Sequence, residues 1–284
     1  MNESYIQFRN NLAELSGILH YGSGHTGVLI IVGGPQYRVG SHRQFVKLSR
    51  ALAIKGIASM RFDTSGMGDS SGKKTVFYQQ TIDIELAIEQ FFLKCPHLKQ
   101  LVLWGLCDAA SAILIKLNRP DPRISGVVLL NPWVRQTQSH AQTMLRHYYL
   151  KRLVSPQFWQ KLFKGGLKLK DSLLSFSQTL SASREKNKIS QHIQGLTDQL
   201  TEQTYVMAML KGWQGFNGKT LVITSGNDLT AQEFLSLCQS NSLWQQQLNS
   251  SQHQHCSEAN HTFSTGQWRQ HVEQQTISFL SSLY

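Results

Sequence analysis

Short apolar runs that suit β-strands alternate along this chain with segments that have helical periodicity. The apolar runs are residues 26–33, 57–63, 101–104, 126–130 and 220–224, with a weaker run at 253–256. The helical patterns lie at residues 41–55, 77–94, 108–118 and 265–283. Strands that alternate with helices favour a parallel sheet, and runs that are apolar throughout are typical of a sheet buried on both faces. The sequence therefore predicts an α/β fold with a mostly parallel central sheet flanked by helices.

The beginning of the chain has a different pattern. Residues 5–8 and 12–19 alternate weakly between apolar and polar side chains. Such alternation is typical of antiparallel strands with one solvated face. We expect these residues to form an antiparallel pair at one edge of the sheet.

One long interval interrupts the alternation of strands and helices. Residues 133–215 contain several helical stretches and no clear strand, and the interval is far longer than one crossover connection needs. A chain of 284 residues suits one large domain that carries an insertion. The sequence predicts an α/β core at residues 1–132 and 216–284, with an inserted helical lid at residues 133–215.

The cysteines and the first ten residues indicate the cellular compartment in which the protein is expected. The four cysteines show no C-x-x-C spacing, so we expect reduced thiols rather than a disulfide framework. The first ten residues lack a basic segment followed by an apolar one, and no apolar run reaches the roughly 20 residues of a membrane span. We expect a cytoplasmic protein.

The densest group of metal-binding residue types is His253, His255 and Cys256. These residues lie in the weakest predicted strand, and short motifs of this kind often match by accident. The phosphate-binding patterns G-x-G-x-x-G and G-x-x-x-x-G-K-[ST] are both absent from the glycine-containing segment after residue 32. We expect neither a metal nor a cofactor.

The apolar run at 101–104 leads directly into a tight turn and a helix. Gly105, Cys107, Asp108 and Ala109 form this turn, and its small residues allow the strand and the helix to approach each other. A nucleophile elbow needs this arrangement, although its usual pattern is G-x-S-x-G, and here cysteine and alanine replace serine and the second glycine. Helix-terminal dipoles and a nearby imidazolium lower a cysteine pKa, which favours Cys107 as a nucleophile. The alternatives are a small buried cysteine or a turn that has lost catalysis, because the charge of Asp108 opposes thiolate formation.

An acid and a histidine follow the turn in the chain order that enzymes with such an elbow use. Asp228 follows the apolar run at 220–224, and His261 lies between the weak run and the last helix. Histidine exchanges protons near neutral pH, and a carboxylate orients its ring. We expect Cys107, His261 and Asp228 to form a catalytic triad. Each partner alone has an ordinary alternative, as a turn aspartate or a surface histidine.

Backbone amides near the turn are candidates for an oxyanion hole, the group of donors that stabilises a developing negative oxygen. The backbone N–H of Asp108 is one candidate. The second is expected from the loop after residues 26–33, where Pro35 has no N–H, so that Gly34 or Gln36 must donate.

These motifs resemble those of the α/β-hydrolase superfamily. The resemblance rests on RFDTSGMGDS at residues 61–70, the elbow, and NHTFS at 260–264. A closer resemblance, to exosortase A system-associated hydrolases, rests on GGPQYRVGSHRQF at 33–45, WGLCDAAS at 104–111, NPWVR at 131–135 and HYY at 147–149. It implies a role in bacterial exopolysaccharide synthesis and protein sorting, without a known substrate. Thr64 and Ser65 depart from the wider superfamily, which often has an aromatic residue and an arginine there.

Most of the positive charge of the chain lies in the predicted lid. Residues 135–188 contain eleven basic and two acidic side chains, a net charge of +9, whereas the whole chain has +11. Aromatic residues are interleaved with these charges. Such a segment suits an anionic membrane surface, an acidic carrier protein or a charged lipid or glycan; the alternative is an ordinary solvated helical face. No nucleic-acid-binding fold is indicated, so we expect no nucleic-acid partner.

Together these features predict a hydrolase that acts on an acyl ester or thioester through Cys107. The expected substrate is a small-molecule, lipid or carrier-bound acyl group, and the expected location is the cytoplasm, with peripheral association with the inner membrane as a variant. Two alternatives remain. An acyltransferase would use the same cysteine, because a thioester can pass its acyl group to an amine or alcohol. A non-catalytic accessory protein would keep the fold and only bind a partner.

Overall fold

The computed structural model describes residues 3–9, 13–135 and 200–283. The contacts divide the chain into two units, Met1–Val134 with Leu200–Tyr284, and Arg135–Gln199. The strands and helices of the described ranges belong to the first unit. The predictions made for residues 136–199, which include the basic segment, lie outside the described residues.

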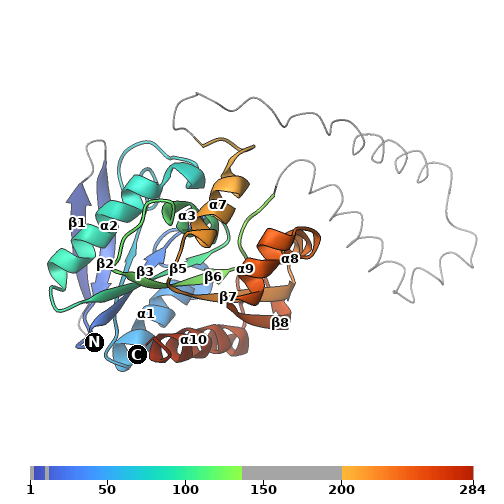
Figure 1. The fold of residues 1–284 in the computed structure, drawn as a ribbon. Coiled ribbons are helices and arrows are strands. Elements are labelled where there is room, and N and C mark those ends of the chain that lie inside the picture. Colours follow the sequence, from blue (N-terminus) through green and yellow to red (C-terminus); the bar gives the residue numbers. More distant parts are fainter. Residues whose placement is uncertain (1–2, 10–12, 136–199, 284) are drawn as a thin grey trace, which may run out of the picture. The chain divides into compact units, whose positions relative to one another are not determined.

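An eight-stranded sheet forms the centre of the first unit, with the strand order β1-β2-β4-β3-β5-β6-β7-β8 (Figure 1). The two pairings of β2, with β1 and with β4, are antiparallel, and all other neighbours are parallel. The mostly parallel sheet and its antiparallel edge are as the sequence predicted. The strands are β1 (Glu3–Arg9), β2 (Glu14–His20), β3 (Thr26–Ile31), β4 (Ala58–Phe62), β5 (Gln100–Leu106), β6 (Ile124–Leu130), β7 (Lys219–Asn227) and β8 (Gln252–Asn260).

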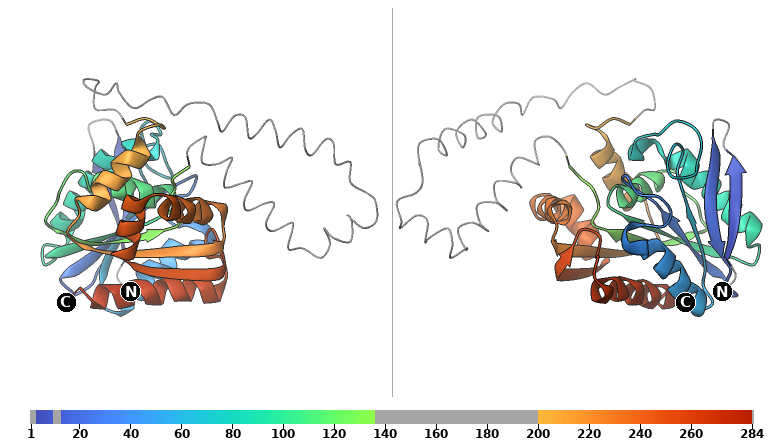
Figure 2. Two further views of the ribbon diagram at one scale, coloured as in Figure 1. Left: turned by 45° about the vertical axis from the view of Figure 1, so that its right-hand side comes forward. Right: turned by 180° about the vertical axis from the view of Figure 1, so that it is seen from behind.

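Helices cover both faces of this sheet (Figure 2). α1 and α10 pack on one face, and α2, α3, α7, α8 and α9 contribute to the core on the other. The helices are α1 (Gln44–Ile54), α2 (Thr81–Lys94), α3 (Asp108–Lys116), α7 (Tyr205–Gln214), α8 (Leu229–Ser240), α9 (Ser242–Asn249) and α10 (Gly266–Ser281), with short 3-10 turns η1 (Ser41–Arg43) and η2 (Phe77–Gln79). None of the helices in these ranges has the length and apolar character needed to cross a membrane.

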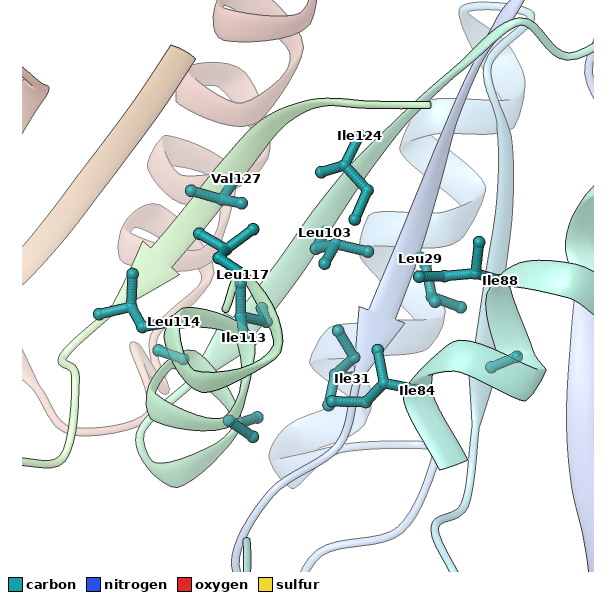
Figure 3. Close-up of a cluster of buried hydrophobic side chains, with 14 of the residues drawn as sticks. Leu29, Ile31, Ile84, Ile88, Leu103, Ile113, Leu114, Leu117, Ile124 and Val127 are labelled. Carbon is teal, nitrogen blue, oxygen red and sulfur yellow. The ribbon is translucent and has the colours of Figure 1, made fainter. Parts of the chain in front are cut away.

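Side chains that alternate along the central strands build the two apolar cores. In β3, Leu29 and Ile31 join the core under α2 and α3, whereas Val28 and Ile30 join the core under α1 and α10. Figure 3 shows Leu29 and Ile31 beside Ile84 and Ile88, which come from α2. Full burial of one such side chain stabilises the fold by about 1.5–3 kcal/mol. The continuous apolar runs in the sequence therefore reflect strands that are buried on both faces.

Two helices differ from the sequence-based expectations. α8 follows β7 directly and was not among the predicted helices. α7 falls inside the interval assigned to the lid, yet it packs against α3 within the first unit. The approach is close, because a Cβ at Gly212 of α7 would lie 1.9 Å from the carbonyl oxygen of Leu114 in α3. Residues 200–214 thus belong with the core.

Candidate active site

Cys107 occupies the sharp turn between β5 and α3. Its φ of 63° and ψ of −125° place this non-glycine residue in a left-handed region that costs conformational energy. Hydrogen bonds fix the backbone on both sides: the N–H of Cys107 donates to the carbonyl of Leu130 at 2.8 Å, and the N–H of Trp133 donates to the carbonyl of Cys107 at 3.3 Å. The turn has the geometry of a nucleophile elbow.

Small neighbours make this turn possible. A Cβ at Gly105 would lie 2.8 Å from the carbonyl carbon of Ala109 and 2.8 Å from Cδ1 of Ile113. Strand and helix therefore approach too closely for any side chain at this position. Ser111, one turn into α3, donates from Oγ to the carbonyl of Trp133 at 2.7 Å. The helix is thereby joined to the segment that follows β6.

The predicted acid and base lie side by side. Asp228 follows β7, and His261 follows β8, the neighbouring strand. Nδ1 of His261 and Oδ2 of Asp228 are 2.9 Å apart. The Asp228 side chain is nearly buried, with 7% exposed, whereas the imidazole is 34% exposed.

Three donors converge on the Asp228 carboxylate, which fixes the roles of the two imidazole nitrogens. The backbone amides of Thr230 and Ala231, at the start of α8, donate to its two oxygens at 3.2 and 3.1 Å. A carboxylate has only acceptor oxygens, and here it serves as the N-cap of α8. Nδ1 of His261 is therefore the third donor. The neutral ring then has its lone pair on Nε2, the nitrogen that a general base needs.

Asn131 holds the His261 loop to the sheet, a role that the sequence did not reveal. This fully buried residue follows β6 with a φ of 44°. Its Nδ2 donates to Oγ of Ser225 at 2.8 Å and to the carbonyl of His261 at 3.1 Å, and its Oδ1 accepts from the N–H of Ser225 at 2.9 Å. The available signal was a polar residue at the carboxyl end of a buried strand, where ligand sites of open α/β sheets lie.

The loop after β3, expected to supply an oxyanion donor, turns its amides toward the protein. The N–H of Gly34 donates to Oδ2 of Asp108 at 2.8 Å. The N–H of Gln36 points back to the carbonyl of Gly33 at 3.4 Å, and its side-chain oxygen accepts from the N–H of Ser41 at 3.1 Å. In this arrangement the predicted donors Gly34 and Gln36 have partners within the protein.

Asp108 is a mostly buried carboxyl beside Cys107, the predicted nucleophile. Burial raises its pKa above the ordinary value, while nearby backbone amides, including that of Gly34, and the charge of His261 act in the lowering direction. His261 follows β8 and the Cys107 turn follows β5, so both lie at the carboxyl ends of parallel strands of the sheet. Cys107, Asp108 and His261 thus share the carboxyl edge of the sheet.

A network of charges anchors the same loop. The N–H of Arg38 donates to Oδ1 of Asp63 at 2.6 Å, and the Arg38 guanidinium contacts the carboxylates of both Asp63 and Asp69. Arg61, near the end of β4, donates to the carbonyl of Arg38 at 3.2 Å. The RFDTSGMGDS segment therefore positions the loop that carries Gly34.

The other cysteines have surroundings that oppose ionisation. Burial raises the pKa of Cys95 and Cys256, and it raises the pKa of Cys238 to about 12. All four cysteines are free thiols. Since a thiolate is the reactive form of cysteine, these three positions are poor nucleophiles.

His253 and His255 take part in hydrogen bonds across the last two strands. Nε2 of His253 and Nδ1 of His255 each lie 2.9 Å from Oγ1 of Thr224 in β7. Within the part of the chain that the structure describes, no group of three or more His, Cys, Asp or Glu side chains is arranged to hold a metal ion.

Comparison with solved structures identifies the fold. An esterase of Pyrococcus furiosus superposes over 99% of this chain and 91% of its own, with a TM-score of 0.65 and 15% identity. An α/β hydrolase of a Penicillium species covers 100% and 98% (TM-score 0.61, 16% identity), and a thermophilic esterase of Thermogutta terrifontis covers 99% and 99% (TM-score 0.58, 14% identity). At such identities the likeness establishes the fold alone. No family model and no curated protein matches the sequence.

Proposed function

We propose that this chain, which has the α/β-hydrolase fold, is an acyl hydrolase whose nucleophile is Cys107. The observation that carries the proposal is the 2.9 Å pair of His261 and Asp228 on the sheet edge at which Cys107 occupies a left-handed elbow. The two esterases among the similar structures are consistent with ester hydrolysis. The resemblance to exosortase-associated hydrolases remains a prediction that these comparisons do not support.

The proposed reaction begins with transfer of the Cys107 proton to Nε2 of His261. The thiolate attacks the carbonyl carbon of an ester or thioester, and the carbonyl oxygen takes the negative charge. Collapse of this intermediate breaks the bond to the leaving alcohol or thiol, which receives the proton from His261. A thioester on Cys107 remains.

Water completes the cycle in the hydrolase. His261 takes a proton from the water, and the resulting hydroxide attacks the carbonyl carbon of the thioester. The C–S bond then breaks, the carboxylic acid is released, and the Cys107 sulfur receives the proton from His261. Throughout, Asp228 holds the ring in one tautomer and stabilises the imidazolium. If an amine or alcohol attacked the thioester in place of water, the same residues would make the protein an acyltransferase.

The proposal extends to substrate class and partners. A small-molecule, lipid or carrier-bound acyl group is the expected substrate, and the net charge of +9 in residues 135–188 favours an acidic carrier protein or an anionic membrane surface as the partner. Sedimentation with vesicles separates these two partners. If equal amounts of protein sediment with neutral and with anionic vesicles at low salt, the anionic membrane is rejected as the partner.

Intact-mass measurement after exposure to an activated acyl ester tests the nucleophile. We expect wild type to gain one acyl group, Cys107→Ala to gain none, and His261→Ala and Asp228→Asn to react at least about 100-fold more slowly, since triad members act as a unit. Cys256→Ala is the matched control, because it removes another partly exposed thiol and is expected to leave acylation intact. Acylation that persists in Cys107→Ala would reject the proposal.

A further inference from the structure

The Asp108 carboxyl accepts a hydrogen bond from the Gly34 amide, which is one of the N–H groups predicted to bind the substrate oxygen. Gly34 has a φ of 64° and donates its N–H to Oδ2 of Asp108 at 2.8 Å. An amide has one hydrogen to donate, so the same N–H cannot also bind a substrate oxygen with good geometry. The carboxylate therefore lies where a negatively charged oxygen would have to bind. We call this hydrogen bond the Asp108–Gly34 latch.

The shape of the loop is adapted to the carboxyl group. A Cβ at Gly33 would lie 2.0 Å from Oδ1 of Asp108 and 2.7 Å from the N–H nitrogen of Ala109. Any side chain at Gly33 would expel the carboxyl from its position. At Gly34 there is room for a side chain, because a Cβ there would lie 4.0 Å from Oδ1 of Asp108. Glycine is favoured at this position by its positive φ rather than by lack of space.

Electrostatics make the latch a strong competitor. A carboxylate that accepts from a backbone N–H forms a charge-assisted hydrogen bond, which is stronger than a bond to a neutral carbonyl. A substrate carbonyl is neutral in the ground state and becomes charged only in the tetrahedral intermediate. The substrate thus meets the Gly34 amide already bound to a charged acceptor, and a second negative charge beside Asp108 would be repelled.

Two glycines in succession provide a way to open the latch. The peptide between Gly33 and Gly34 has no side chain on either side, so its rotation meets less steric resistance than at other residues. The neighbouring segment is fixed, because Arg38 is tied to Asp63 and Arg61 holds the Arg38 carbonyl. The glycine pair is therefore the part of this loop with the greatest backbone freedom.

We propose that the Asp108 carboxyl occupies the oxyanion position on the Gly34 amide in the resting protein, and that the latch must open before Cys107 can be acylated. This inference rests on the proposed function, since it assigns a resting state to the same site. It makes Asp108 a residue that limits the rate rather than one that promotes the reaction. Removal of its carboxyl should increase acylation.

Two reactions of the Cys107 thiol distinguish the opening of the latch from a general change in thiol reactivity. Alkylation by iodoacetamide requires the thiolate but no oxyanion donor, whereas acylation by an activated ester requires both. For Asp108→Ala we expect the ratio of acylation to alkylation rates to rise about ten-fold over wild type. Asp108→Asn keeps the shape with a neutral acceptor and should give a smaller rise. Asp121→Asn removes a carboxylate at the opposite edge of the sheet and should leave the ratio unchanged.

Hydrogen exchange at the Gly34 amide, measured by NMR, gives a readout that does not depend on activity. Exchange should be faster in Asp108→Ala than in wild type, with the fold checked by thermal unfolding. If acylation occurs but its ratio to alkylation stays the same or falls in both Asp108 variants, the latch is rejected and the proposed function stands. If wild type and both variants alkylate at Cys107 and none acylates, the proposed function and the latch both fail.

Discussion

The side chain of Asn131 donates a hydrogen bond to the backbone carbonyl of His261, with 3.1 Å between Nδ2 and the oxygen. This contact joins the carboxyl end of β6 to the loop after β8, although β7 lies between the two strands. The second hydrogen of the same NH₂ group binds Oγ of Ser225 in β7. One buried amide therefore fixes the backbone of the proposed base relative to two strands.

Replacement of Asn131 by Asp should separate turnover from binding. The variant keeps the shape but has no NH₂ group, so the His261 carbonyl loses its donor and faces a negative charge. We expect kcat to fall about 10- to 100-fold with KM within a few-fold of wild type, because a small displacement of a catalytic group has a large effect on rate. Asn241→Asp is the control, since Asp caps a helix as well as Asn does. If KM changes by as large a factor as kcat does, Asn131 does not act by positioning His261.

Alanine at Gly105 tests the tight approach of β5 and α3. The added Cβ would lie 2.8 Å from backbone and side-chain atoms of α3, so we expect a loss of about 1–3 kcal/mol in the free energy of unfolding. Gly266→Ala is the matched control, because at the first position of α10 the nearest atom, of Arg269, is 3.8 Å away. There we expect no loss, or a gain of up to about 1 kcal/mol. Urea unfolding of both variants checks the prediction, which equal destabilisation would refute.

His20 should make the fold sensitive to mild acid. Burial lowers the pKa of this fully buried imidazole from 6.5 to about 4; Glu3 acts in the raising direction, and Arg61 and Arg50 reinforce the lowering. The unfolded chain therefore binds a proton at higher pH than the folded protein does, and stability is lost as the pH falls from about 6.5 toward 4. Between pH 7 and pH 5 this group should account for a loss of about 2 kcal/mol.

Urea unfolding of wild type and His20→Gln at the two pH values measures that loss. The variant has no titrating group at this position. Between pH 7 and pH 5 its free energy of unfolding should therefore fall by about 2 kcal/mol less than that of wild type. His97→Gln, at an exposed histidine, should behave like wild type. The same pH dependence in all three proteins would show that His20 is not the responsible group.

The sequence predicted most of the architecture because its signals are local. Apolar runs identified β3 to β7, since strands buried on both faces leave few polar positions. α8 was not predicted because its first residues continue directly from β7 and Asp228, which also serves as its N-cap. α7 was assigned to the lid because nothing local shows that Gly212 packs against the backbone of α3.

The candidate site was predictable in part for the same reason. Cys107, Asp228 and His261 follow strands in an order that the sequence displays, and the structure brings the last two into direct contact. The Asp108–Gly34 latch and the Asn131–His261 contact join residues that are 74 and 130 positions apart. Such pairings depend on strand order and on side-chain direction, which residue types alone do not specify. The prediction of Gly34 as an oxyanion donor therefore did not anticipate its hydrogen bond to Asp108.

The close packing of α3 has a mechanical consequence. Its first turn holds the segment after β6 through Ser111 and Trp133, and Asn118, two residues beyond its C-terminal end, donates to the carbonyl of Ala208 in α7 at 2.7 Å. Along the chain, Trp133 and Ala208 lie before and after residues 136–199, which are outside the described residues. The helix that starts at Cys107 is thus attached to the core at both of its ends, to the segment after β6 and to α7. A displacement of α7 would therefore be passed to Cys107 through one helix, α3.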